Sequence, residues 1–341
     1  FLYFFLILVL IVLNSCNNGE KTPDVSNIKV DITTERFEKD FFKLDTANPI
    51  DALRKLQEKY PDFSSYYYER VLGIDGSGNA GNAISPFLFS YRSIYDSAQF
   101  IFSDFSKYEK EIKKGLQFVK YYFPSYKLPS KIITFIGPLD ASYKTSFGLQ
   151  GDIITNDAIG IGLQLHLGKD FSFYKSEQGI QMYPEYISNR FEPGTIAVNA
   201  LRNITDDLYS EKTDDKPLVQ QMVEKGKRLY LLQKFLPYAE EYKLIGYTTE
   251  QFKQAIAHEK EIWNMFVQNG SLQSIDENII KNYIGESPKT QELGDASPGN
   301  IGSFAGWQIV KKYMQKNPEI TLQKLMATDA DTIFQEAKYK P

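Results

Sequence analysis

Residues 257–263 of this 341-residue chain read AHEKEIW, which starts as the metal-binding helix of a zinc peptidase starts. In such a helix two histidines one turn apart hold the metal, and the glutamate after the first histidine is the general base. Here Ile262 occupies the place of the second histidine. We therefore interpret His258 as a residue at the flank of an ordinary helix; a lone metal ligand is the alternative.

Glu259 stands in the middle of an apolar stripe on the helix predicted over 248–268. At about 100° per residue, the stripe falls within about 60° of one direction. An isolated buried carboxylate is costly, so Glu259 needs a partner or a polar cavity. We predict a structural ion pair with Arg202 or Arg190, and a catalytic role is the alternative. The stripe consists of Phe252, Ala255, Ile256, Ile262, Trp263 and Phe266.

A second predicted helix, 193–209, carries polar side chains at the spacing of a metal pair. Asn199 and Asn203 lie four residues apart, opposite the apolar side of the helix, and Asp206 lies near them. Amides are poor zinc ligands, so no metal is expected here. The polar side either faces a cleft or is an exposed surface, and the pattern does not separate the two.

A predicted strand at 158–168 alternates large apolar residues with glycine, Gln164 and His166. Alternation places Ile161 to Leu167 on one face and the polar residues on the other. Glycines let another backbone come close, and strand addition to a sheet edge is a general way to bind peptides. We predict that Gln164 and His166 border a binding groove; the alternative is that His166 is an exposed strand residue.

Composition narrows the chemistry further. The chain has two histidines and one cysteine, so neither a cysteine-rich zinc module nor an internal disulfide can form, and a metal site would depend on carboxylates. Lys+Arg 39 against Asp+Glu 43 leaves no excess of positive charge for nucleic acid. We assign no catalytic residue, metal, cofactor or nucleic-acid partner.

The single cysteine ends a recognisable N-terminal pattern. Residues 1–13 are an apolar run of signal-peptide length, and LNSC follows, ending at Cys16. This pattern resembles a bacterial lipobox and predicts a signal peptide at 1–15 and a lipidated, flexible tether at 16–28; a short membrane anchor with an incidental cysteine is the alternative. Two or more acyl chains on Cys16 would hold the protein to a lipid bilayer. Asn17 favours the outer membrane.

The remaining pattern predicts one α+β domain over 29–341, with a small mixed sheet followed by a mainly helical half. Strands are expected in the opening segment IKVDITTERF and at 131–137, besides the one at 158–168. A helix is expected from Pro49 and two more over 86–122. The later helices are predicted at 193–209, 216–236, 248–268, 301–316 and 321–336.

Several stretches together resemble the gliding-motility lipoprotein family GldB of the Bacteroidetes. They are HLGKDFSFY, YPEYISNRFEP, EKGKRLYLLQKFLP, HEKEIWNMF, SPGNIGSFAGWQIVKKYM and the ending IFQEAKYKP. The resemblance runs over about residues 9 to 341. It implies a lipid-anchored envelope protein that faces the periplasm, is required for gliding and binds other envelope proteins of the gliding machinery. No reaction is implied.

A fainter likeness is to predicted zinc-dependent peptidases of zincin-like fold. It would place the metal helix at 193–209, with Asn199, Ala200 and Asn203 in one register or Val198, Asn199 and Arg202 in another. Neither register leaves a metal site, and Glu224 falls only near the position of a third ligand. The likeness therefore implies a degenerate fold, a pseudo-peptidase without zinc.

Three functions follow from these observations. We favour a non-catalytic lipoprotein that binds a partner or a peptide. The second is a metallopeptidase with the unconventional ligands His166, His258, Glu224 and Glu259. The third is a metal-independent envelope hydrolase using Asp206, Asp207 and Glu259, although no spacing demands it. The candidate groove residues are Gln164, His166, Asn199, Arg202, Asn203, Glu224 and Glu259.

Overall fold

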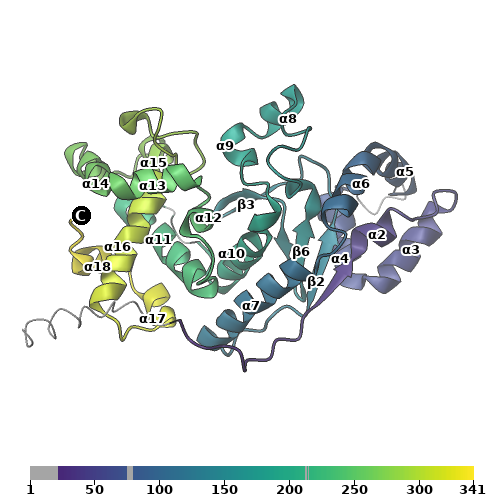
Figure 1. The fold of residues 1–341 in the computed structure, drawn as a ribbon, viewed down its shortest axis with the longest axis horizontal. Coiled ribbons are helices and arrows are strands. Elements are labelled where there is room, and N and C mark those ends of the chain that lie inside the picture. The colour runs from purple at the N-terminus through teal and green to yellow at the C-terminus, as the bar shows by residue number, and fades with distance from the viewer. Residues whose placement is uncertain (1–21, 75–79, 212, 214) are drawn as a thin grey trace, which may run out of the picture.

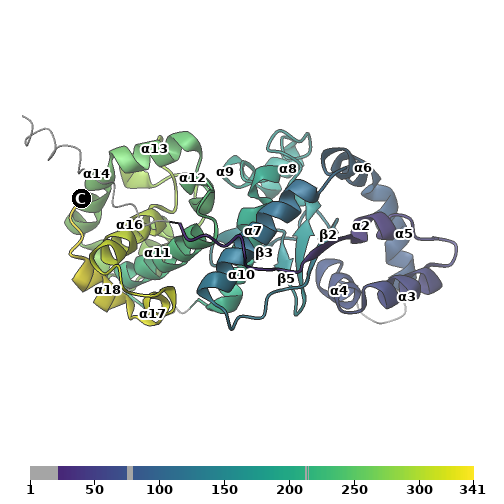
Figure 2. The same cartoon turned by 60° about the horizontal axis from the view of Figure 1, so that its bottom comes forward.

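The computed structural model describes residues 22–74, 80–211, 213 and 215–341. The described chain is an α+β protein, as predicted, with a small sheet near its middle and helices on both sides (Figure 1). Helices from the N-terminal part of the chain stand at one end, and helices from the C-terminal part form the other end (Figure 2). No helix within this described part is long and apolar enough to span a membrane.

The main sheet has four strands in the order β1-β2-β6-β5, and it is mixed, as predicted. The first three run parallel, and β5 pairs antiparallel with β6. The helical segment between β1 and β2 supplies the crossover that parallel neighbours need. The strands are β1 (Thr33–Arg36), β2 (Lys131–Phe135), β5 (Ile153–Ile154) and β6 (Ala158–Gly162), with a separate hairpin of β3 (Tyr143–Thr145) and β4 (Gly148–Gln150).

The N-terminal helices enclose an aromatic cluster beside the sheet. The Phe37 ring meets Phe63 and Tyr67 edge-on, with centroids 5.0 and 4.8 Å apart, and the Tyr67 hydroxyl donates to Ile136 O at 2.5 Å. The helix predicted from Pro49 is confirmed, whereas the aromatic-rich region forms three helices instead of two. Their bounds are α2 (Phe37–Phe41), α3 (Pro49–Lys59), α4 (Pro61–Tyr66), a π-helical turn (Tyr67–Val71), α5 (Ala80–Ser90), α6 (Arg92–Ile101) and α7 (Ser106–Tyr122).

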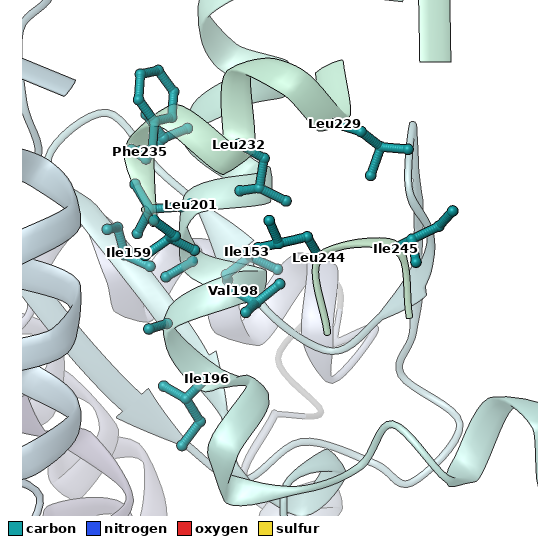
Figure 3. Packing of buried hydrophobic residues seen from close by; sticks show 14 of the residues in the cluster. Ile153, Ile159, Ile196, Val198, Leu201, Leu229, Leu232, Phe235, Leu244 and Ile245 are labelled. Atoms are coloured by element: carbon teal, nitrogen blue, oxygen red, sulfur yellow. The ribbon is translucent and has the colours of Figure 1, made fainter. Parts of the chain in front are cut away.

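Helix α10 lies between the sheet and α11, and α16 packs on α11. Figure 3 shows Val198 and Leu201 of α10 among Ile153 and Ile159 from the sheet and Leu232 from α11, all of them buried. The bounds are α8 (Glu177–Met182), α9 (Glu185–Ser188), a 3-10 turn (Pro193–Thr195), α10 (Ile196–Leu208), α11 (Leu218–Phe235), α12 (Glu241–Ile245), α13 (Thr249–Ala257), α14 (Glu259–Gln268), α15 (Glu277–Tyr283), α16 (Ile301–Lys316), α17 (Leu322–Ala327) and α18 (Ala330–Ala337).

Two of the predicted long helices are broken in the structure. The segment predicted as 248–268 forms α13 and α14, which meet at His258 with φ −110° and ψ 26°. The segment predicted as 321–336 forms α17 and α18, because the Asp329 side chain caps the N-terminus of α18 by accepting from Asp331 N. The helices expected at 193–209, 216–236 and 301–316 are confirmed, apart from the 3-10 turn that opens the first.

The N-terminal boundary of the folded part lies earlier than predicted. Val25 is 1 % exposed, and the side-chain amide of Gln117 donates to Ile28 O at 2.8 Å. Residues from Val25 onward therefore pack on the globular part, although we assigned them to the tether of 16–28. The predicted signal peptide at 1–15 and Cys16 lie outside the described residues.

Candidate functional site

A cleft of about 810 Å³ opens beside α10, and it contains two of the predicted groove residues, Asn199 and Arg202. Four basic side chains and two acidic ones line it, so its lining is positively charged. We call it the arginine cleft. Its walls come from α9, the 3-10 turn before α10, α12, and the start of α13. The charged lining residues are Lys169, Glu185, Arg190, Glu192, Arg202 and Lys243.

Arg202 is the unusual member of this cleft because it is a buried cation without an anionic partner. Its side chain donates to Leu244 O at 2.9 Å and to Asn199 Oδ1 at 3.3 Å, and it lies 5.3 Å from the Phe147 ring centroid. Within the described chain it forms no ion pair, and its Nε has no hydrogen-bond partner. The residue is 4 % exposed.

The surroundings of Arg202 disfavour its positive charge. Burial, together with the positive charge of Arg190, lowers the pKa of the Arg202 guanidinium to about 9. Glu286 and Asp206 act in the opposite direction but do not compensate. Burial of an unpaired charge opposes folding. Residues with strongly shifted pKa values are concentrated at functional sites, so Arg202 is a candidate binding residue.

The side chains of Arg190 and Arg202 both lie against Gly246. It ends α12 in the left-handed conformation, with φ 85° and ψ 24°, which glycine adopts readily. A Cβ at this position would lie 3.0 Å from Arg190 Cδ and 3.6 Å from Arg202 Nη2. Arg190 also forms an ion pair with Glu286, so its charge is balanced whereas that of Arg202 is not.

The prediction that Gln164 and His166 border a groove is wrong. Strand β6 lies between β2 and β5, so it offers no free edge for an added strand. The extended backbone ends at Gly162, and residues 163–165 form a 3-10 turn that turns the side chains inward. Gln164 is fully buried and accepts from Gly137 N at 3.0 Å, and His166 is not exposed either.

His166 instead forms a buried pair with Asp152, a residue that the sequence analysis missed. His166 Nε2 lies 2.9 Å from Asp152 Oδ2, and Gly162 N donates to Asp152 Oδ1 at 2.9 Å. On its other side His166 Nδ1 lies 3.4 Å from the Thr195 hydroxyl at the cleft margin. That hydroxyl already donates to Glu192 O at 2.7 Å, so it is not presented to His166 as a nucleophile.

The three remaining predicted residues lie apart from the arginine cleft. Asn203 is buried and accepts from Gln150 Nε2 at 2.7 Å. Glu224 pairs with Lys227 at 3.1 Å along α11. Glu259 is half-buried, and it accepts from the Tyr339 hydroxyl at 2.5 Å.

The predicted ion pair of Glu259 with Arg202 or Arg190 is therefore wrong. Burial and the hydrogen bond to Glu259 raise the pKa of Tyr339, which keeps this phenol a donor. The apolar stripe also divides where the helix breaks at His258, so that Ile256 is 43 % exposed while Ile262 stays buried. The stripe was calculated for one continuous helix, so it could not predict that the helix axis changes direction at His258.

The carboxylates considered for hydrolysis do not form a pair. Asp206 accepts from Ser146 N at 2.9 Å, whereas Asp207 accepts from the Tyr126 hydroxyl at 2.5 Å. His258 is exposed, far along the chain from His166, which is buried. Over the described ranges, no three or more histidine, cysteine, aspartate or glutamate side chains come together as a possible metal site.

The fold and the cleft define an α+β protein with a basic, partly buried hollow beside its central helix. The family model for gliding motility protein GldB matches residues 18–341, nearly the whole chain, and the chain belongs to this family. It is thus a gliding-motility lipoprotein associated with the cell envelope. No curated protein and no solved structure matches it.

Proposed function

We propose that this protein is a non-catalytic component of the gliding machinery that binds an extended segment of another envelope protein in the arginine cleft. The observation that carries the proposal is Arg202, a buried guanidinium without a counter-ion at the wall of a cleft of about 810 Å³. A bound partner would supply what the free protein lacks there. The dispersal of the other polar candidates, among them His166, Glu224 and Glu259, supports binding over catalysis.

Blocking the cleft should stop gliding without unfolding the protein. Gly194 lines the cleft and is exposed, and a Cβ placed on it meets no atom within 4 Å. Gly194→Trp therefore fills the cleft entrance rather than the core. We expect cells carrying it to lose colony spreading, while the purified variant keeps the melting temperature of the unchanged protein.

The control for this experiment is Val267→Trp, which places the same large side chain on α14. Val267 is 54 % exposed and does not line the cleft. Cells with this variant should spread normally. Normal spreading with Gly194→Trp, at an unchanged amount of protein, would rule out the cleft as the working site.

We further propose that acylated Cys16 anchors the protein to a lipid bilayer, facing the periplasm, with the outer membrane favoured. The apolar run that ends in LNSC and the polar residue Asn17 support this arrangement. Cys16→Ser in the full precursor should abolish incorporation of labelled palmitate and leave the protein unprocessed or released from membranes. Continued labelling of the substituted protein would contradict the anchor.

A further inference from the structure

A second hollow adjoins the arginine cleft and shares Gly194 and Lys243 with it. Its volume is about 490 Å³, and it lies between α7, α10 and the segment after α11. The floor is apolar and includes Phe118, Val198 and Leu236, each of them buried. We call it the lysine groove, because Lys107, Lys110 and Lys114 of α7 stand along it.

The lysine groove is lined by the four lysines Lys107, Lys110, Lys114 and Lys243 and by the two glutamates Glu111 and Glu240, so its lining is positively charged. In the described part of the chain Lys107, Lys110 and Lys114 form no ion pair, and Lys114 lies 5.6 Å from the Phe118 ring centroid. Lysines of this kind cover apolar surface with their stems and present their ammonium groups at the rim. Glu240, one of two acidic groups in the groove, is already paired with Lys243 at 2.6 Å.

We call the two adjoining hollows, which share Gly194 and Lys243, the track. The arginine cleft contributes the buried guanidinium of Arg202, the lysine groove contributes an apolar floor with a lysine rim, and exposed Gly194 lines both. Arginine binds carboxylates through two parallel hydrogen bonds, and such charge-assisted bonds are about twice as strong as neutral ones. The track therefore suits an extended chain that alternates acidic and apolar side chains.

We infer that the segment bound by this protein is an acidic peptide, with one carboxylate held by Arg202 and its flanking residues lying across Gly194 in the lysine groove. The inference rests on the proposed function and adds the chemistry of the partner. The carboxylate supplies the missing counter-ion of Arg202, the lysines attract the other acidic side chains, and Phe118 and Leu236 receive the apolar ones.

The test uses a fluorescein-labelled octapeptide that alternates glutamate with leucine, and fluorescence polarisation with the purified protein. Three further peptides have glutamine in place of glutamate, a C-terminal amide in place of the carboxylate, or both changes. We expect the glutamate peptide to bind at least about tenfold more tightly than the doubly changed one, since one charge-assisted hydrogen bond is of that size. Loss on amidation alone assigns the Arg202 ligand to a chain terminus, and loss on the glutamine change alone assigns it to a side chain.

Arg202→Met should weaken binding of the glutamate peptide at least about tenfold and remove the preference for carboxylate. Because Arg202 also donates to Leu244 O, this variant is checked for folding, and Lys110→Glu provides an independent test at an exposed position of the rim. Lys110→Glu should weaken the glutamate peptide and not the glutamine one. The control is Arg54→Met, an exposed arginine on α3, which should bind as the unchanged protein does.

Equal binding of the four peptides, or no binding of any, overturns the inference. If Gly194→Trp abolishes gliding but the glutamate and glutamine peptides bind equally, the cleft is functional and the assignment of an acidic peptide as its ligand is wrong. If Gly194→Trp has no effect on gliding, the proposed function fails first. Inorganic phosphate that raises the melting temperature through Arg202, with no binding of the glutamate peptide, would also overturn the peptide assignment.

Discussion

Gly306→Ala is expected to prevent stable packing of the helical half. Helices α11 and α16 cross so closely that a Cβ at Gly306 would lie 1.7 Å from Met222 O, and one at Gly226 would lie 2.2 Å from Gly306 O. Both contacts are with backbone, which cannot rotate away as a side chain can. We expect a loss of about 3 kcal/mol or more in the free energy of unfolding, at the upper end for overpacked cores.

Urea unfolding of the purified variant measures this loss. The matched control is Gly194→Ala, where the added methyl group meets no atom within 4 Å and the stability should not change. Gly226→Ala should behave like Gly306→Ala, because it presses the same two helices apart. An unchanged midpoint for Gly306→Ala would mean that α11 and α16 do not approach each other this closely.

The same contact joins two of the stretches that resemble the family. EKGKRLYLLQKFLP contains Gly226 and SPGNIGSFAGWQIVKKYM contains Gly306, so a glycine of one stretch lies against a glycine of the other. The pair HEKEIWNMF and IFQEAKYKP is joined in the same way, because the Tyr339 hydroxyl donates to Glu259 and the Tyr339 ring meets Trp263 at 5.0 Å. Residues that looked like separate motifs are contacts within one core.

The fold class could be predicted because its signals are local. β2 is a β-branched run that is almost wholly buried in a sheet, and α16 is apolar on most sides because it is enclosed. The failures come from backbone events that hydrophobic periodicity does not register. Strand β6 ends at Gly162, and a 3-10 turn follows it. His258 departs from helical geometry, although the apolar residues keep their helical spacing in the sequence from α13 into α14.

The candidate site could be predicted only in part. Asn199 and Arg202 share a turn of α10, so their spacing in the sequence placed them together. Arg190, Lys243 and Gly246 come from other segments, and only the tertiary fold brings them to Arg202. A pairing such as His166 with Asp152, joined across a hairpin-like return of the chain, leaves no periodic signal in either segment.

His166→Ala should produce the second large loss of stability. Asp152 and His166 have side chains 0 % and 1 % exposed, and removing His166 leaves the Asp152 carboxylate in the core with the hydrogen bond from Gly162 N. Removing one partner of a buried pair costs about 3–5 kcal/mol, since the other charge remains buried. The matched control is Asp96→Ala, which breaks an exposed pair with Arg92 and should change the unfolding midpoint little.

The same variant also separates the binding and hydrolase functions. In a double-mutant cycle, Asp152→Ala with His166→Ala should be less destabilising than the sum of the two single changes, because the second removes a group already unpaired. If the pair is structural, gliding should fall only as far as the amount of folded protein falls. If His166→Ala instead melts like the unchanged protein and still abolishes gliding, His166 acts on a bound molecule, and the non-catalytic function is wrong.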